Sequence, residues 1–378
     1  MFSNLLLQLI VFFLPTQLGL HFWPAFSRAA GIKVDYLSPT LYFTDLLLLS
    51  FCFLNFASIF KWLKKYLFIV STILVFVLLN SFFGLSPLNS LLWWSHNLLY
   101  LLFFLTLRLR RVSWPQIKTS LLTSTILVVS LEIYQFLHQG SAGGFFYWLG
   151  ERSFTSSTPG LGRLSWFGLD LIRPQSTFSH PNSLAGYLLL VYFLFQHFKS
   201  PLWSKMVVFT GLILALSKGA LLAFLLVFTF QLNSLFLILG FLFLALGQIL
   251  LPQIIGSYRF IADRLFLLAP AKTIISRFPI WGVGLGNFIP ALGNLLPGSF
   301  LLPAKLQPVH NIFLLGLSEL GLVGVTFFAV LGQVVRPKSF KPAIWILISL
   351  VVITGSFDHY WWTLPQNKLI LLLAAAVL

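Results

Sequence analysis

Residues 308–321, which read PVHNIFLLGLSELG, place His310 at the start of an otherwise apolar stretch that is typical of a membrane helix. A histidine in such a place is costly unless it is hydrated or has a functional role. A polar and basic segment, residues 257–307, comes directly before it and is too polar to lie in lipid. A lone histidine could simply anchor the end of a helix, but these neighbours favour a site that faces water.

The composition is that of an integral membrane protein. Hydrophobic residues make up 58% of the 378 residues and charged residues only 8%, with a mean hydropathy of +0.94. Such a chain lacks the polar residues that cover a soluble globule. Helices of about 20 apolar residues satisfy their own backbone polar groups in the hydrocarbon core, so we expect an all-α fold. Cys52 is the single cysteine, which excludes an internal disulfide and a cysteine-rich metal site.

The apolar runs predict about twelve transmembrane helices in a single domain, residues 1–378. The first run has no basic segment before it and no small-residue cleavage site after it, so we interpret it as a retained span and not a signal peptide. The expected spans are residues 4–20, 39–60, 66–83, 89–107, 119–138, 183–198, 203–217, 219–232, 234–251, 310–333, 342–357 and 366–378.

Membrane topology explains part of the net charge of +16. The basic residues are scattered between apolar runs and do not form the continuous face that nucleic-acid binding needs, so we expect no nucleic-acid partner. With both termini in the cytoplasm, the predicted cytoplasmic loops contain basic residues and no acidic residue, as the positive-inside rule requires. Both long polar loops, residues 139–182 and 252–309, then face outward. The basic residues of the cytoplasmic loops are Lys61, Lys64, Lys65, Arg108, Arg110, Arg111, Lys118, Lys199, Lys205, Arg336, Lys338 and Lys341.

This topology depends on Lys218. Residues 206–230 could form one long span with Lys218 at its centre, but a lysine at the bilayer midplane costs about 2.5–3.5 kcal/mol. We therefore predict a break at residues 217–219, where two short helices meet at the outer surface with Lys218 at their tip.

The outward loops combine turn-forming residues with basic side chains. The first loop ends in residues 173–182, RPQSTFSHPN, just before a predicted span. In the second loop, the spacing over residues 258–278 predicts a helix that lies in the membrane interface and suits an anionic group. Residues 282–286, GVGLG, resemble a dinucleotide fingerprint but lack a preceding strand, so we expect a tight turn there instead. The basic residues of the interfacial segment are Arg259, Arg264, Lys272 and Arg277.

The outward histidines are His180, His310 and His359, and none has a metal-ligand spacing with an acidic residue or another histidine. We therefore expect no metal and no cofactor. Fixed cations (Lys218, Arg264 and Arg173) can neutralise a diphosphate in place of a metal, while a histidine transfers a proton near neutral pH. Glu319 lies nine residues after His310, on the opposite side of an ideal helix, so we expect it to contact another helix.

The chain resembles the superfamily of O-antigen ligases and O-antigen polymerases, which are membrane glycosyltransferases of the bacterial envelope. The order of the matching segments and their outward placement carry the resemblance, which extends over most of the chain. The segments are residues 35–39 (DYLSP), 173–182 (RPQSTFSHPN), 217–219 (SKG), 278–288 (FPIWGVGLGNF), 309–311 (VHN) with Glu319 and Gly321, and 357–360 (FDHY) with Gln366.

This resemblance implies a C-type glycosyltransferase-like fold in the bacterial cytoplasmic (inner) membrane, with an extracytoplasmic active site. Members of the superfamily are similar in needing two arginines and the histidine of a His-Asn pair. Arg264 and His310 match, whereas Lys218 stands where the second arginine is expected, and a lysine keeps the charge but not the planar two-point grip on phosphate. The residues expected to bind substrate are Arg173, Arg259, Arg277, Asn311, His180 and Asn182.

The predicted reaction is an inverting, metal-independent transfer of a glycan from undecaprenyl diphosphate to an acceptor hydroxyl. His310 is the expected general base, and Arg264 and Lys218 are expected to hold the diphosphate. The expected acceptor is a glycan or a lipid: a ligase would use a lipid or another terminal acceptor, and a polysaccharide polymerase would use another repeat unit. Protein glycosylation by a related enzyme is a third alternative, and all three stay open. The alternative from another class is a transporter or lipid-linked glycan flippase, which would place charges on broken helices at the membrane midplane.

Overall fold

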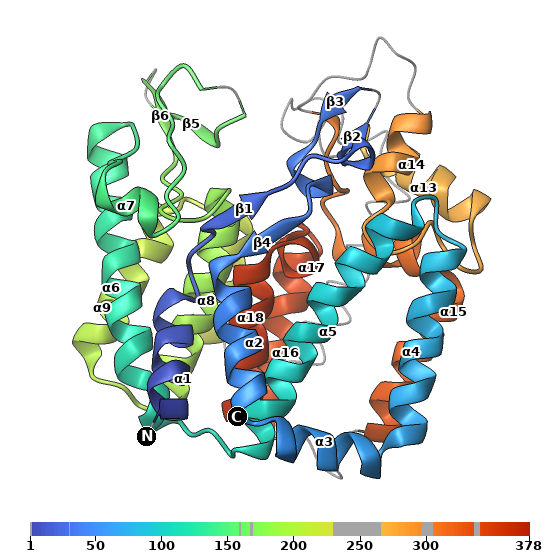
Figure 1. Cartoon of the computed structure of the whole chain (residues 1–378). Coiled ribbons are helices and arrows are strands. Elements are labelled where there is room, and N and C mark those ends of the chain that lie inside the picture. Colours follow the sequence, from blue (N-terminus) through green and yellow to red (C-terminus); the bar gives the residue numbers. More distant parts are fainter. Residues whose placement is uncertain are drawn as a thin grey trace.

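The computed structural model describes residues 2–29, 31–158, 160–166, 169–229, 266–295, 305–335 and 341–378, and these residues are nearly all-α (Figure 1). The α-helices are α1 (Phe2–Phe13), α2 (Phe43–Leu54), α3 (Phe56–Lys65), α4 (Leu67–Phe82), α5 (Pro87–Leu109), α6 (Trp114–His138), α7 (Phe145–Trp148), α8 (Pro181–His197), α9 (Leu202–Leu214), α10 (Lys218–Phe224), α13 (Leu268–Arg277), α14 (Phe288–Leu295), α15 (Ile312–Val335), α16 (Pro342–Gly355), α17 (Tyr360–Thr363) and α18 (Pro365–Val377).

The strands in the described ranges form three antiparallel two-stranded ladders, which pair β1 with β4, β2 with β3 and β5 with β6. Short 3-10 helices span Ala25–Ser27 and Asp35–Leu37, and a π-helical segment, Leu225–Thr229, continues α10. The strands are β1 (Gly19–His21), β2 (Arg28–Ala29), β3 (Ile32–Lys33), β4 (Thr40–Tyr42), β5 (Arg163–Trp166) and β6 (Leu169–Ile172).

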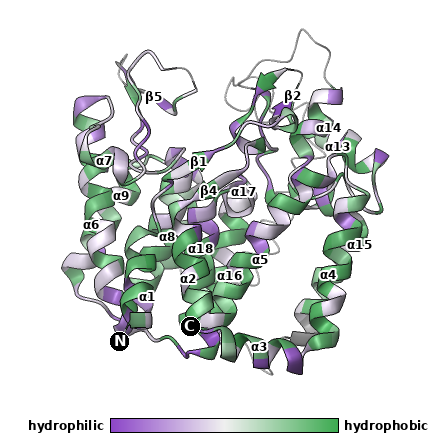
Figure 2. Cartoon of the chain, in the orientation of Figure 1, coloured by the Kyte–Doolittle hydropathy of each residue, from purple (hydrophilic) through white to green (hydrophobic). Residues whose placement is uncertain are grey.

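Three helices of the described residues are long and apolar enough to cross a membrane: α5, α6 and residues 312–332 of α15. The pair α2 and α3 makes a fourth if it counts as one span, although its two helices are bent by 75°. The other apolar helices, which include α1, α4, α9, α16 and α18, are shorter. Figure 2 shows hydrophobic residues along most of these helices, and hydrophilic residues gathered on α3 and on the strands and loops at the opposite end.

The predicted spans fall on helices wherever the structure describes them, but two of their boundaries are wrong. The first span, residues 4–20, is helical only to Phe13, because the chain then pairs Gly19 with Tyr42 in a short antiparallel ladder. That same ladder occupies the start of the second span, residues 39–60, which also bends at Asn55. The predicted span at residues 234–251 lies outside the described residues.

The predicted break before Lys218 is confirmed. Helix α9 ends at Leu214, and α10 begins at Lys218. Between them, Leu216 adopts a left-handed backbone conformation with φ 51°, which no α-helix can continue through. The break therefore presents Lys218 at the first position of a new helix, where its side chain is exposed.

Helix α8 lies at the centre of the largest hydrophobic cluster. Its residues from Pro181 to Val191 are all buried, and it packs against α9, α18, α16 and α10. A helix that is apolar on every side is expected to be enclosed by other helices. The N-terminus of α8 is therefore a fixed position, and residues placed there are held rigidly relative to α16 and α18.

The glycine-rich segment 282–286 forms the predicted turn between α13 and α14, and it also interrupts α15. The N–H of Val283 donates to the carbonyl of Ser318 at 2.9 Å, and the N–H of Leu322 donates to the carbonyl of Pro279 at 2.8 Å. Gly282 lies so close that a Cβ there would be 2.5 Å from the Glu319 carbonyl carbon. This crossing joins the segment between α13 and α14 to the first half of α15.

Gly321 is required at this crossing because its φ is 62° and its ψ is −173°, a region open essentially to glycine alone. We expect Gly321→Ala to lower the free energy of unfolding by about 1–3 kcal/mol. Gly332→Ala is the matched control on the same helix, because a Cβ there would meet nothing within 4 Å. Thermal unfolding in detergent measures both variants, and equal stability of the two would contradict the constraint at Gly321.

Candidate functional site

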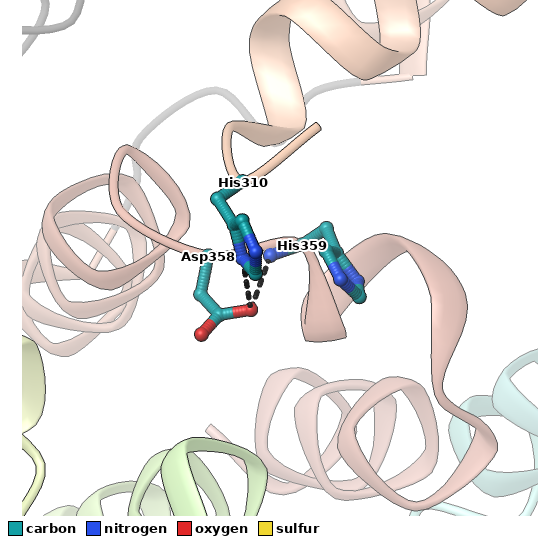
Figure 3. A group of neighbouring side chains, drawn as sticks. All are labelled: His310, Asp358 and His359. Atoms are coloured by element: carbon teal, nitrogen blue, oxygen red, sulfur yellow. Dashed lines mark hydrogen bonds and ion pairs between the residues drawn. The ribbon is translucent and has the colours of Figure 1, made fainter. Parts of the chain in front are cut away.

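A buried carboxylate, Asp358, lies at the centre of the site. Its Oδ1 accepts a hydrogen bond from the backbone N–H of His359 at 2.8 Å, and its Oδ2 accepts one from the side-chain amide of Asn182 at 2.7 Å. His310 Nδ1 lies 3.6 Å from Oδ1, which is too long for a hydrogen bond but within ion-pair range (Figure 3). We call His310, Asp358 and His359 the Asp358 cluster.

The surroundings of Asp358 favour its charged form. Burial by itself would raise the pKa of the carboxyl, but the contact with His310 and the electrostatic attraction of the His310, His359 and His180 side chains outweigh burial and hold the pKa well below its usual range. Asp358 is therefore an ionised group at neutral pH. An ionised carboxylate beside an imidazole orients the ring and stabilises the imidazolium that forms when the ring accepts a proton.

His310 is placed by the start of α15. The next residue, Asn311, accepts hydrogen bonds from the N–H groups of Phe313 and Leu314, both at 3.0 Å, and so satisfies two open donors of the first helical turn. The side-chain amide of Asn311 also donates to the carbonyl of Ser356 at 3.3 Å. Asn311 therefore ties the mouth of α15 to the segment that carries Asp358, while the expected contact of Asn311 with substrate stays a prediction.

Three predicted residues of the first loop meet at the N-terminus of α8. Arg173 Nη2 donates to Asn182 Oδ1 at 2.8 Å, and Asn182 in turn donates to Asp358. His180 caps the helix, because its Nδ1 accepts the N–H of Asn182 at 3.1 Å. The structure thus brings Arg173, His180 and Asn182 to the Asp358 cluster, while the expected contact of these residues with substrate stays a prediction.

Lys218 lies near the same group of residues. Arg173 donates through Nε and Nη2 to the carbonyl of Ala215, at 3.1 and 2.9 Å, three residues before Lys218. A Cβ added to Gly219 would lie 3.9 Å from Cβ of Phe357, the residue before Asp358. The break between α9 and α10 therefore places an exposed lysine next to the segment that holds the carboxylate.

The structure does not place the other predicted basic residues, Arg259, Arg264 and Arg277, next to the Asp358 cluster within the residues it describes. Arg277 is exposed at the C-terminal end of α13, and no hydrogen bond or ion pair joins it to the cluster in the part of the chain that the structure describes. Arg259 and Arg264 lie outside the described residues, as does the first part of the predicted interfacial helix. Its described part is helical, as α13.

A cavity of about 670 Å³ borders the site. Its walls come from β1, β4 and α5, and from the segment that joins α17 to α18. Tyr36, Ser179 and Thr363 line it on the side of the cluster, where the Tyr36 ring meets the His359 ring edge-on with centroids 5.6 Å apart. A volume in this range holds a small organic ligand such as one or two sugar rings.

Glu319 contacts another helix, as expected from its position opposite His310. Its Oε2 accepts a hydrogen bond from Trp362 Nε1 of α17 at 2.8 Å. A second histidine–carboxylate pair, His96 and Asp45 at 3.3 Å, lies on α5 and α2, with His96 lining the cavity. The sequence analysis did not predict this second pair.

The sequence analysis noted His359 as an outward histidine and quoted FDHY at 357–360 as a matching segment, but it did not assign Asp358 or His359 to the site. They lie about fifty residues after His310, in FDHY at 357–360, so no local spacing relates them to it. The sequence feature that could have identified them is the pair Asp358-His359 itself, because an ionisable pair between two apolar runs is costly unless other polar or charged residues contact it.

Comparison of the chain with protein-family models, with curated proteins and with solved structures gives no match.

Proposed function

We propose that this chain is an O-antigen ligase-like glycosyltransferase that moves a glycan from undecaprenyl diphosphate to an acceptor hydroxyl at the outer face of the cytoplasmic membrane. The observation that carries the proposal is the pair of His310 and Asp358 beside the basic residues Arg173 and Lys218. Transfer of a glycosyl group from a diphosphate requires a group that accepts the acceptor's proton and fixed positive charge that stabilises the leaving diphosphate. These residues provide both.

In the proposed reaction, His310 acts as the general base. Its Nδ1 faces Asp358, so Nε2 is the nitrogen that meets the acceptor hydroxyl. As the acceptor oxygen bonds to the anomeric carbon, its proton passes to His310, and the bond from that carbon to the diphosphate oxygen breaks. Asp358 stabilises the imidazolium, and attack from the side opposite to the diphosphate inverts the anomeric configuration.

The leaving diphosphate needs positive charge. Lys218 and Arg173 supply it in the described part of the chain, and the resemblance adds Arg264. Arg173 donates to Ala215 and Asn182, so its guanidinium is fixed in place beside the cluster, where it contributes positive charge. Lys218 is exposed and can move its ammonium toward a phosphate. The cavity beside Tyr36 and Thr363 provides room for the acceptor.

The proposed topology has about twelve spans with both termini in the cytoplasm. The two termini lie at the same end of the molecule (Figure 1). Basic residues assigned to the cytoplasm contact them, since Arg108 donates to the carbonyl of Ala376 at 3.3 Å and Lys341 bonds to that of Leu378. Arg110 likewise bonds to Ser3 and Asn4. A basic end that carries both termini supports an inside location for that end.

We expect His310→Ala to lower the transfer rate by roughly a hundredfold or more, because it removes the general base. Folding should be kept, since Asp358 retains its bonds to His359 and Asn182. The assay follows release of undecaprenyl diphosphate by protein in nanodiscs, with His138→Ala, an exposed histidine at the end of α6, as the control. A rate above about a tenth of the parent's would remove His310 from the role of base.

Two variants of Lys218 separate the contribution of its positive charge from that of its side-chain geometry. If it grips the donor diphosphate, Lys218→Arg keeps or improves activity, whereas Lys218→Ala weakens donor use by about 1.5–3 kcal/mol, the worth of a charged hydrogen bond. We expect Arg264→Ala to be at least as harmful, and the double variant with Lys218→Ala to be less than additive if both cations hold one phosphate group.

These variants are compared by transfer rate against the concentration of lipid diphosphate. Parent-like behaviour of Lys218→Ala would reduce Lys218 to an interfacial anchor. The diphosphate would then be held elsewhere, with Arg173, Arg259 and Arg277 the next residues to substitute.

We expect transfer to persist in excess EDTA, because fixed cations take the place of a metal in the proposed mechanism. The rate of undecaprenyl diphosphate release is measured before and after chelation and dialysis. Complete loss of transfer with recovery on adding Mg²⁺ or Mn²⁺ would overturn the metal-independent mechanism. The carboxylates of Asp35, Asp45, Asp170 and Asp358 would then be tested as ligands.

A further inference from the structure

The Asp358 cluster has the composition and spacing of a metal site. His310, Asp358 and His359 each offer one ligand atom, and these atoms all lie within 4.8 Å of one another. Within the described ranges, no other group of three such side chains comes this close. Two imidazoles and one carboxylate form a ligand set that binds transition metals and leaves coordination positions open.

Hydrogen bonds outside the cluster already hold two of the three ligands in place. His359 Nδ1 lies 2.9 Å from Thr363 Oγ1, a contact that fixes the orientation of the ring. Asn182 donates to Asp358 Oδ2, which leaves Oδ1 facing His310. Partners of this kind orient metal ligands and are a regular part of metal sites.

The third ligand has an unsatisfied nitrogen. His310 Nδ1 is buried and makes no hydrogen bond to any residue that the structure describes. Its separation of 3.6 Å from Asp358 Oδ1 is close to the distance between two ligands on one zinc ion, which binds nitrogen and oxygen at about 2.0–2.2 Å. A buried nitrogen without a hydrogen bond is costly, and a bound ion would satisfy it.

We infer that His310, Asp358 and His359 bind a divalent transition-metal ion of the zinc class, and that the bound ion inhibits the enzyme by occupying its base. The inhibitory part rests on the function proposed above, whereas the binding part does not. Imidazole nitrogens favour zinc, cobalt, nickel and copper, while magnesium and calcium prefer oxygen ligands alone. When the ion binds Nδ1 of His310, the neutral ring carries its proton on Nε2, the nitrogen proposed to meet the acceptor hydroxyl. Nε2 can then no longer accept the acceptor's proton, and transfer stops.

The setting indicates reversible occupancy and not a permanent structural ion. The His310 side chain is 20% exposed, and the cavity that Tyr36 and Thr363 line reaches the His359 side of the cluster. The nearby positive charges of Lys218 and Arg173 oppose the binding of a cation. Asp358 is the single acidic residue of the cluster, so the affinity depends on all three ligands together.

The binding test uses Co²⁺ and Zn²⁺ as probes on the full chain, purified in detergent without a histidine tag. We expect the parent to bind a single Co²⁺ per chain with the visible absorption bands of a low-coordinate ion, which Zn²⁺ then displaces. His359→Ala and His310→Ala should each lose these bands. His96→Ala is the matched control and should keep them, because His96 forms the same kind of pair with Asp45 but has no third ligand within the described residues.

Loss of binding through misfolding is separated from loss of a ligand by thermal unfolding. The parent and His96→Ala should become more heat-stable when Zn²⁺ is added, whereas folded His310→Ala and His359→Ala should show no such shift. Failure of the parent to bind Co²⁺ or Zn²⁺ with this stoichiometry would overturn the inference. So would binding that survives in both His310→Ala and His359→Ala.

Inhibition is measured separately from binding. We expect Zn²⁺ to lower the rate of undecaprenyl diphosphate release by the parent at least tenfold, EDTA to restore the rate, and His359→Ala to need a higher Zn²⁺ concentration for the same loss. Stoichiometric metal binding without any transfer would remove the proposed function and leave the metal site in place. Transfer without metal binding would overturn the metal site and leave the proposed function in place.

Discussion

The site depends on one buried charge, the carboxylate of Asp358. A charge taken out of water is tolerated only where hydrogen bonds and opposite charges replace the lost hydration. Here those partners come from three places in the chain: Asn182 at the start of α8, His310 before α15 and the backbone of His359 before α17. The carboxylate therefore links the start of α8 and the mouth of α15 to the segment between α16 and α17, and the hydrogen bond from the Asn311 amide to Ser356 adds a second link between the last two.

The cluster is held by two different kinds of support. On one side, α8 is enclosed by other helices, so Asn182 and Arg173 approach from a rigid core. On the other side, the start of α15 is fixed by backbone hydrogen bonds to the glycine-rich segment around Gly282 and by the Asn311 amide. The segment that carries α13 and the glycine-rich turn is thereby connected to the helix that follows His310.

The two histidine–carboxylate pairs of the described residues differ in the residues that surround the carboxylate. His96 and Asp45 are closer together, at 3.3 Å, and His96 lines the large cavity. Asp45, however, accepts its other hydrogen bonds from two neutral groups, the backbone N–H of Tyr42 and the hydroxyl of Tyr100. Asp358 is surrounded instead by histidines, with Arg173 linked to it through Asn182. In the proposed function, this second setting is the one that places positive charge beside an anionic leaving group.

The sequence by itself determined the helical membrane character, the break before Lys218 and the turn at residues 282–286, because hydropathy, charge cost and glycine conformation act locally. It also predicted that Arg173, His180, Asn182 and His310 share one outward site. Only the tertiary structure decided that Asp358 and His359 join them, since a carboxylate about fifty residues from His310 meets it through the packing of α15, α16 and α17. The same holds for the ladder between Gly19 and Tyr42, which shortens the first two predicted spans through pairing that no local pattern encodes.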